Sequence, residues 1–203
     1  LAMSGIALAQ SSDDTDVDSD RVARGVEMLM EKLGPLVEDG TITESQAATV
    51  AETLAEVGSR SQDPGALTPA ARVALGRSII QHINGMGPEM QVITLDPSLE
   101  QILHKSIQAD SEGGAGIEPG LAERMHRSLV ESVQRQEAAG HPAILLVTPP
   151  IRPWLAKLVR HSIPGLHVLA YSEIPDNKQI KVVANIGTGA PSLGARNDGS
   201  TTA

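Results

Sequence analysis

The stretch Ala143–Thr148 (AILLVT) is an unbroken, mostly aliphatic run, with Pro142 before it and Pro149-Pro150 after it. A short apolar run between residues that cannot continue a strand is typical of a β-strand buried on both faces. Strands of this kind belong to parallel sheets whose two faces are covered by helices. The stretch therefore predicts an α/β sheet in the second half of the chain.

Strands and helices alternate around that run. Three more strands are expected from β-branched or alternating apolar residues, at Met90–Leu95, Leu166–Tyr171 and Gln179–Ile186. Helices are expected from Asp96-Pro97 to Ile107, from Leu121 to Ala139, and around Trp154–Val159 with an end at Gly165. The turn residues of Glu173–Lys178 (EIPDNK) predict a hairpin between the last two strands.

The chain before Glu89 has a helical pattern instead. Apolar residues recur every three or four positions, the spacing that lines one helix face. Three helices are expected: Val22–Leu36, Ala47–Val57 after a capping box of Thr43 and Gln46, and Thr68–Ile83. The predicted fold class is therefore α/β, with a helical N-terminal subdomain followed by a small mixed-sheet α/β subdomain.

Four segments follow from these patterns. We expect a disordered acidic linker over residues 1–20, a helical subdomain over 21–89, an α/β C-terminal subdomain over 90–187 and a disordered tail over 188–203. Residues 11–20 (SSDDTDVDSD) contain five aspartates and almost nothing apolar, so they cannot bury enough surface to offset the entropy lost on ordering. Residues 188–203 show no apolar periodicity.

Composition excludes several classes of function. The 203 residues contain no Cys and no Phe, one Trp and one Tyr, and 16 Lys+Arg against 25 Asp+Glu. Without cysteine there is no disulfide framework, thiol nucleophile or thiolate zinc site. Without aromatic platforms and a basic excess, a nucleic-acid partner is not expected. Much of the formal charge of −9 lies in the acidic segment, so it says little about the folded part.

Local signatures of catalysis are missing. The glycine-rich loop Gly113–Gly116 follows a predicted helix and lacks the lysine of a phosphate-binding loop. The six histidines form no HExxH or HxH motif, and no GxSxG sequence is present. A Ser/His/Asp triad could still be assembled by the fold. We expect a chain that is not an enzyme, with no catalytic residue, cofactor or metal.

The loop after the buried strand is a candidate binding element. Ile151–Trp154 (IRPW) places the only tryptophan beside Arg152, where strand ends of α/β folds often carry binding loops. In one interpretation Trp154 covers the sheet and Arg152 faces solvent. In the other, both side chains contact a ligand.

A series of motifs resembles a known family. In chain order they are Leu67–Pro69 (LTP), Arg72–Arg77 (RVALGR), Val92–Glu100 (VITLDPSLE), Glu118–Ala122 (EPGLA), Arg135–Glu137 (RQE), Leu145–Val147 (LLV), Arg152-Pro153, Val168-Leu169 and Glu173–Pro175 (EIP). The order and content resemble the cytoplasmic domain of the FlhA family of flagellar export-gate proteins. The resemblance covers roughly residues 22–187 and is strongest from Ala51 onward. Injectisome export gates share the layout, but Glu118–Gly120 and Pro175–Gln179 look flagellar.

This resemblance implies a role in bacterial type III protein export. In that family a membrane bundle carries a cytoplasmic domain, which assembles into a nine-membered ring and receives chaperone-bound filament subunits. The implied partners are flagellar export chaperones with their filament-type cargo, other export-apparatus proteins including the ATPase complex, and further copies in a homo-oligomeric ring. The implied location is the cytoplasmic face of the bacterial inner membrane, and the implied role is a docking platform without catalysis.

The resemblance also implies a docking site. Family members receive chaperones in an apolar dimple marked by an Asp, a Phe and a Thr. Alignment through Glu52–Glu56 and Gly76-Arg77 places Gln46, Thr49 and Ile80 at these positions, so all three depart from the family pattern. Thr49 with Ile80 could still supply the apolar centre of a transient docking surface.

Two hypotheses stay open at this point. In the first, the chain is a docking platform, and its candidate docking residues are Gln46, Thr49, Ile80, Arg152 and Trp154. In the alternative, it is a small α/β enzyme or ligand-binding domain that uses the loops Gly113–Gly116 and Arg152–Trp154. An enzyme should have a deep pocket with converging titratable groups, whereas a platform should bind other proteins and itself.

Overall fold

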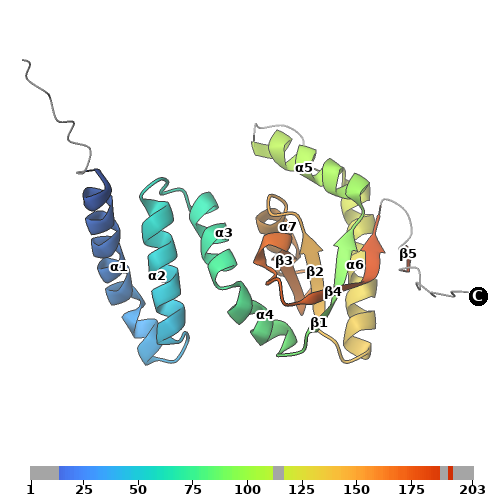
Figure 1. Cartoon of the computed structure of the whole chain (residues 1–203). Coiled ribbons are helices and arrows are strands. Elements are labelled where there is room, and N and C mark those ends of the chain that lie inside the picture. The colour runs from blue at the N-terminus through green and yellow to red at the C-terminus, as the bar shows by residue number, and fades with distance from the viewer. Residues whose placement is uncertain (1–13, 112–116, 188–191, 194–203) are drawn as a thin grey trace, which may run out of the picture. The chain divides into compact units, whose positions relative to one another are not determined.

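A computed structural model of the chain describes residues 14–111, 117–187 and 192–193 (Figure 1). The chain divides into two compact units, which we call unit 1 (Leu1–Leu75) and unit 2 (Gly76–Ala203). Residues 1–13 of the expected linker, and the expected tail apart from residues 192–193, lie outside the described residues. Within the described ranges, no helix is both long enough and apolar enough to cross a membrane.

Unit 1 consists of three helices, α1 (Asp14–Glu38), α2 (Glu44–Gly58) and α3 (Pro64–Ala74), with α2 in contact with both others. Small residues bring α1 and α2 together. Ala47 and Ala51 of α2 are fully buried, and a Cβ added at Gly25 of α1 would lie 3.2 Å from Cβ of Ala55. The two helices therefore approach closely through alanine and glycine rather than through large side chains.

The first helix begins earlier than the sequence pattern predicts. We expected residues 14–20 in a disordered linker, but they form the first turns of α1. Acidic residues are favourable there because the first turn of a helix carries a partial positive charge from its free N–H groups. The composition argument considered only the entropy lost on ordering, whereas residues 14–20 belong to α1.

The expected third helix is two helices. α3 ends at Ala74 with Leu75 as its C-cap, and α4 (Gly76–Asn84) belongs to unit 2. The boundary between the two units therefore lies between Leu75 and Gly76, and not near residue 89 as the pattern predicts. The cause is tertiary: Ile80 of α4 is fully buried in a core cluster with residues of the sheet.

Unit 2 is built on a five-stranded sheet. The strands are β1 (Glu89–Leu95), β2 (Ala143–Val147), β3 (Leu166–Ala170), β4 (Gln179–Ile186) and β5 (Ser192–Leu193), in the order β3-β2-β1-β4-β5. The first four strands are parallel, and β5 runs antiparallel to β4. Every residue of β2 is buried, as the apolar run predicts. The predicted mixed-sheet α/β subdomain after a helical part is therefore confirmed.

The predicted hairpin is wrong. β3 and β4 are not neighbours, because β4 passes to the other side of β1 and pairs with it in parallel. The segment between them contains a short 3-10 helix, η1 (Tyr171–Glu173), and a tight turn closed by Lys178 N–H donating to Pro175 O at 3.1 Å. Turn residues predict a change of direction, but they do not determine which strand is paired next.

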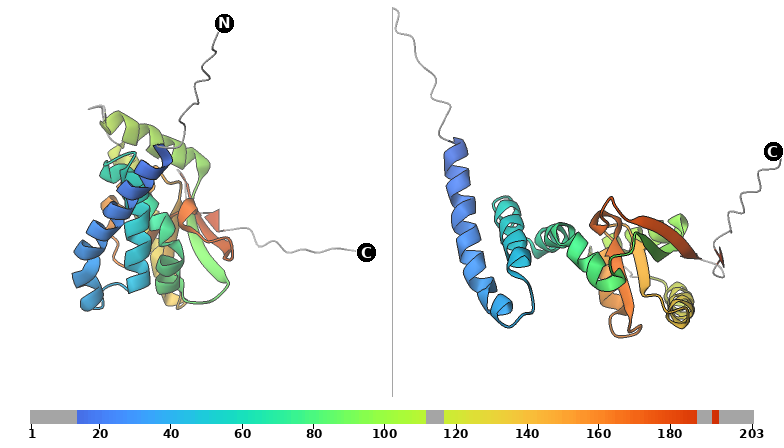
Figure 2. Two further views of the ribbon diagram at one scale, coloured as in Figure 1. Left: turned by 60° about the vertical axis from the view of Figure 1, so that its left-hand side comes forward. Right: turned by 60° about the horizontal axis from the view of Figure 1, so that its bottom comes forward.

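Helices cover both faces of the sheet. α5 (Pro97–Ser111), α6 (Pro119–Ala138) and α7 (Arg152–Val159) contribute to the larger core cluster on one face. α4 covers part of the other face, where Ile80 packs with Met90, Val92, Ile144, Leu146 and Leu169. Figure 2 shows α4 and α6 on opposite sides of the sheet. The aliphatic composition is thus sufficient for two cores around one sheet.

Candidate functional site

A groove of about 740 Å³ lies in unit 2 along α7 and β3. β3 is the last strand of the sheet on that side, so the groove follows a strand edge. One face of α7 lines it through Pro153, Ala156, Lys157 and Arg160, which recur at the three- and four-residue spacing of a helix face. Ile83 of α4 completes its apolar lining on another side.

The charged side chains of this groove have one sign. Its ionisable lining residues are Arg152, Lys157, Arg160, His161 and His167, and no Asp or Glu lines it. Lys157 and Arg160 are exposed and form no ion pair with any residue that the structure describes. Positive charge is therefore concentrated here in a chain whose formal net charge is −9.

Arg152 is held at the wall of the groove. Its Nε donates a hydrogen bond of 3.3 Å to the carbonyl oxygen of Val168 and lies 3.7 Å from Oε1 of Glu173. The Glu173 side chain is only 3% exposed, against 18% for Arg152. The guanidinium therefore links α7, the edge strand and η1, and it is not directed freely into solvent.

Trp154 lies beside the groove but does not line it. Its ring is half-buried and packs against the larger core cluster. The side chain thus covers the hydrophobic core, as one of the two interpretations of this loop expects.

His167 carries a perturbed imidazole in the groove. Partial burial lowers the pKa of His167 below its ordinary value of 6.5, and the charge of nearby His82 on α4 lowers this pKa further. Burial disfavours the charged form of the ring, and a second positive charge does the same. At neutral pH the positive charge of the groove therefore comes chiefly from its arginine and lysine side chains.

Gln46 and Thr49 lie on α2, where both side chains bond to the helix itself. Gln46 Oε1 accepts from Thr43 N–H at 2.8 Å, and Thr43 Oγ1 accepts from Gln46 N–H at 3.2 Å. The predicted capping box is therefore confirmed. The Thr49 hydroxyl donates to Ser45 O at 2.9 Å, and its side chain is half-buried.

Ile80 is not at a surface. Its side chain is fully buried in unit 2, whereas Gln46 and Thr49 belong to unit 1. A side chain without exposed area cannot form the apolar centre of a docking surface in this conformation. The expectation that Thr49 and Ile80 supply such a centre is corrected accordingly.

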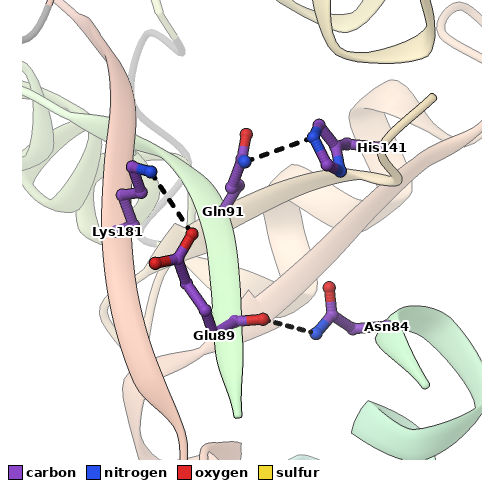
Figure 3. A network of polar contacts seen from close by, with 5 residues as sticks. All are labelled: Asn84, Glu89, Gln91, His141 and Lys181. Atoms are coloured by element: carbon purple, nitrogen blue, oxygen red, sulfur yellow. Dashed lines mark hydrogen bonds and ion pairs between the residues drawn. The ribbon is translucent and has the colours of Figure 1, made fainter. Parts of the chain in front are cut away.

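A polar network surrounds the start of β1 (Figure 3). Asn84 Nδ2 donates to Glu89 O at 3.0 Å, Lys181 Nζ lies 3.3 Å from Glu89 Oε1, and Gln91 Nε2 lies 3.3 Å from His141 Nε2. These contacts join α4, β1, β4 and the turn before β2 at exposed positions. They place a single ion pair, Glu89 with Lys181, at the exposed edge of this network.

Across residues 14–111, 117–187 and 192–193, no group of three or more His, Asp or Glu side chains is placed to hold a metal ion. The glycine-rich loop Gly113–Gly116 lies outside the described residues.

Sequence reasoning missed most of the groove. Of its basic residues it singled out only Arg152. The sequence pattern could have indicated Lys157 and Arg160, because their spacing places them on the same helix face as Pro153 and Ala156. No local pattern indicates His167 or Ile83, because only the fold brings them to the groove.

The comparison with known proteins decides the family. The model of the FHIPEP family matches residues 25–179. The chain belongs to the FHIPEP family. Flagellar biosynthesis protein FlhA of Salmonella typhimurium is 45% identical over 139 residues, which cover 68% of this chain and 20% of that protein. This FHIPEP chain therefore spans about a fifth of the length of that relative. The export-gate family resemblance of the sequence motifs is confirmed.

Solved structures share the fold of this FHIPEP chain. The Chlamydia pneumoniae CdsV protein has a TM-score of 0.63 at 23% identity, over 85% of this chain and 50% of that one. The nonameric EPEC SctV-C has a TM-score of 0.59 at 22% identity, over 85% of this chain and 52% of that one. At these identities the likeness establishes a common fold.

Proposed function

We propose that the chain is a protein-docking module of the flagellar type III export gate, which receives chaperone-bound filament subunits for secretion. The observation that carries this proposal is the 45% identity to a flagellar FlhA protein over 139 residues. Because the chain spans a fifth of that relative, the proposal concerns this module and not the activity of a complete gate.

Assembly and location belong to the same proposal. We infer a homo-oligomeric ring at the cytoplasmic face of the inner membrane, with contacts to other export-apparatus proteins including the ATPase complex. The nonameric state of SctV-C, which has the same fold, supports the ring. The module acts in this proposal by binding alone, without catalysis.

The docking surface in unit 1 is proposed on α2. Thr49 is half-buried, and its hydroxyl donates to Ser45 O, so a partner can cover this side chain while the hydroxyl stays hydrogen-bonded. Transient docking surfaces bury a modest area with an apolar centre and a polar rim. Gln46 lies at the capped end of the same surface.

A binding experiment tests the function. The chain is immobilised, and flagellar chaperones are added alone and with their filament subunits, with an unrelated chaperone as control. We expect binding in the micromolar range typical of transient contacts, and Thr49→Lys should weaken it more than Glu52→Lys on the exposed side of α2. Absence of chaperone binding, or turnover of a small molecule in the groove, would favour the enzyme or ligand-binding alternative.

Self-association is measured separately. Analytical ultracentrifugation over a range of concentrations should show growth of oligomers with concentration. A monomer at all concentrations would contradict the ring but leave chaperone docking standing.

A further inference from the structure

The groove along α7 and β3 has three properties that define what can occupy it. Its charged lining is wholly basic or imidazole, its floor is apolar, and it follows the edge strand of the sheet. From these we propose that the groove binds an acidic polypeptide segment of a partner protein. The proposal deepens the docking function, and it rests on that function only in assuming that the chain acts by binding proteins.

Charge complementarity is the first support. Lys157 and Arg160 are exposed on one face of α7 and have no carboxylate partner among the described residues. The Cβ atoms of positions three residues apart on a helix lie about 5–6 Å apart, so Lys157 and its neighbour Arg160, the C-cap of α7, place two cations side by side along the groove. A row of charges matches carboxylates spaced along a polypeptide better than it matches a single small anion.

The floor of the groove is the second support. Ile83, Ala156 and Leu166 line it together with prolines 153 and 164, so apolar side chains lie between and below the charges. An apolar centre with a charged rim is the usual composition of a protein-binding surface. A mixed acidic and aliphatic segment can satisfy both parts of this lining.

Polyanions of other classes fit less well. No Phe, Tyr or Trp side chain lines the groove, so it lacks the rows of large aromatic rings on which single-stranded nucleic acids usually stack. A short acidic segment meets only the local positive charge.

The binding test uses the full chain and a defined probe. A short peptide of alternating Glu and Leu is labelled with a fluorophore, and its anisotropy is followed at low and high salt. The same peptide with Gln in place of Glu is the uncharged control. We expect saturable binding of the acidic peptide that weakens with salt, little binding of the Gln peptide, and a change in the emission of Trp154, the only tryptophan, which lies on α7.

Charge-reversal variants locate the site. Lys157→Glu with Arg160→Glu should weaken binding by about tenfold or more, because like charges then face the peptide. Lys32→Glu with Lys105→Glu makes the same change in net charge at exposed positions outside the groove and should leave binding nearly unchanged. If the reversed groove pair fails to fold, Lys157→Gln with Arg160→Gln repeats the test without repulsion. Equal affinities of the groove variants and the Lys32/Lys105 control would overturn the proposal.

Rival occupants give different outcomes. Equal or tighter binding of a short oligonucleotide, inorganic phosphate or vesicles with anionic lipid, lost in the Lys157/Arg160 variant, would overturn the peptide assignment.

The acidic residues 13–20 of the chain itself are tested by replacing their five aspartates with Asn. If only that variant binds the peptide, the groove is filled by the chain itself, and the partner proposal is wrong. If the groove variants still bind chaperones, the proposed function stands whatever the peptide result is. If only Thr49→Lys loses chaperone binding, the groove proposal is unaffected.

Discussion

Arg152 Nε lies 3.7 Å from Oε1 of Glu173, and this ion pair joins the start of α7 to the turn that follows the edge strand. The carboxylate is almost completely buried, and the guanidinium also donates to Val168 O. One wall of the basic groove is therefore set by a pair of residues that are close in space but separated by β3.

Arg152→Met should destabilise unit 2, because the buried Glu173 carboxylate would lose the positive charge of Arg152. We expect a loss of about 2–3 kcal/mol in the free energy of unfolding, at the lower side of what breaking a buried pair costs, since Arg152 is partly exposed. Urea unfolding followed by Trp154 fluorescence measures it. The double variant Arg152→Met with Glu173→Leu should recover part of the loss. A double variant no more stable than Arg152→Met would show that the pair itself is not the cause.

Gly76→Ala should also destabilise unit 2. A Cβ at Gly76 would overlap the carbonyl oxygen of Glu173, which is backbone and cannot move away as a side chain can. Overpacking of this kind costs about 1–3 kcal/mol. Gly87→Ala is the matched control, because a Cβ there meets nothing within 4 Å. Thermal unfolding of the two variants should separate them clearly, and equal melting temperatures would contradict the close approach.

Thr43→Ala should loosen the start of α2. The substitution removes the hydroxyl that accepts from Gln46 N–H at 3.2 Å. Loss of such a cap costs about 1 kcal/mol of helix stability. Hydrogen exchange of the Gln46 amide should become faster in Thr43→Ala than in Thr49→Val, which removes a hydroxyl from the interior of the same helix. Unchanged exchange at Gln46 would argue against the capping box.

The stability of unit 2 should fall as the solution is acidified. The pKa of His167 is lowered by burial and then by the charge of His82, so the unfolded chain binds this proton more readily than the folded chain. Above the pKa of the unfolded-state imidazole, about 6.5, His167 is neutral in both states and its contribution to the stability of unit 2 is fully present. This contribution is lost as pH falls through that value toward the lower pKa of the folded state. Unfolding between pH 7.5 and pH 5 should show a flatter dependence for His167→Gln than for His104→Gln. Parallel curves for both variants would contradict this assignment.

The sequence predicted the local elements well. Apolar runs and periodicity located β1, β2, β3 and β4, and the capping box located the start of α2. These features depend on neighbours within a few residues, so a linear pattern records them. Of the groove, the sequence indicated Arg152 and the helix that carries it.

Only the tertiary structure decided how these elements combine. β4 pairs with β1 and not with β3, the expected third helix is interrupted at Leu75, and Ile80 is buried in the core. The groove unites Ile83, α7 and His167, which come from separate parts of the chain. A periodic sequence states which face of an element is buried, but the partner that buries it is chosen by packing between distant segments. For this reason the family and most elements were determined by the sequence alone, whereas the break between α3 and α4, the strand order and the basic groove were decided by the fold.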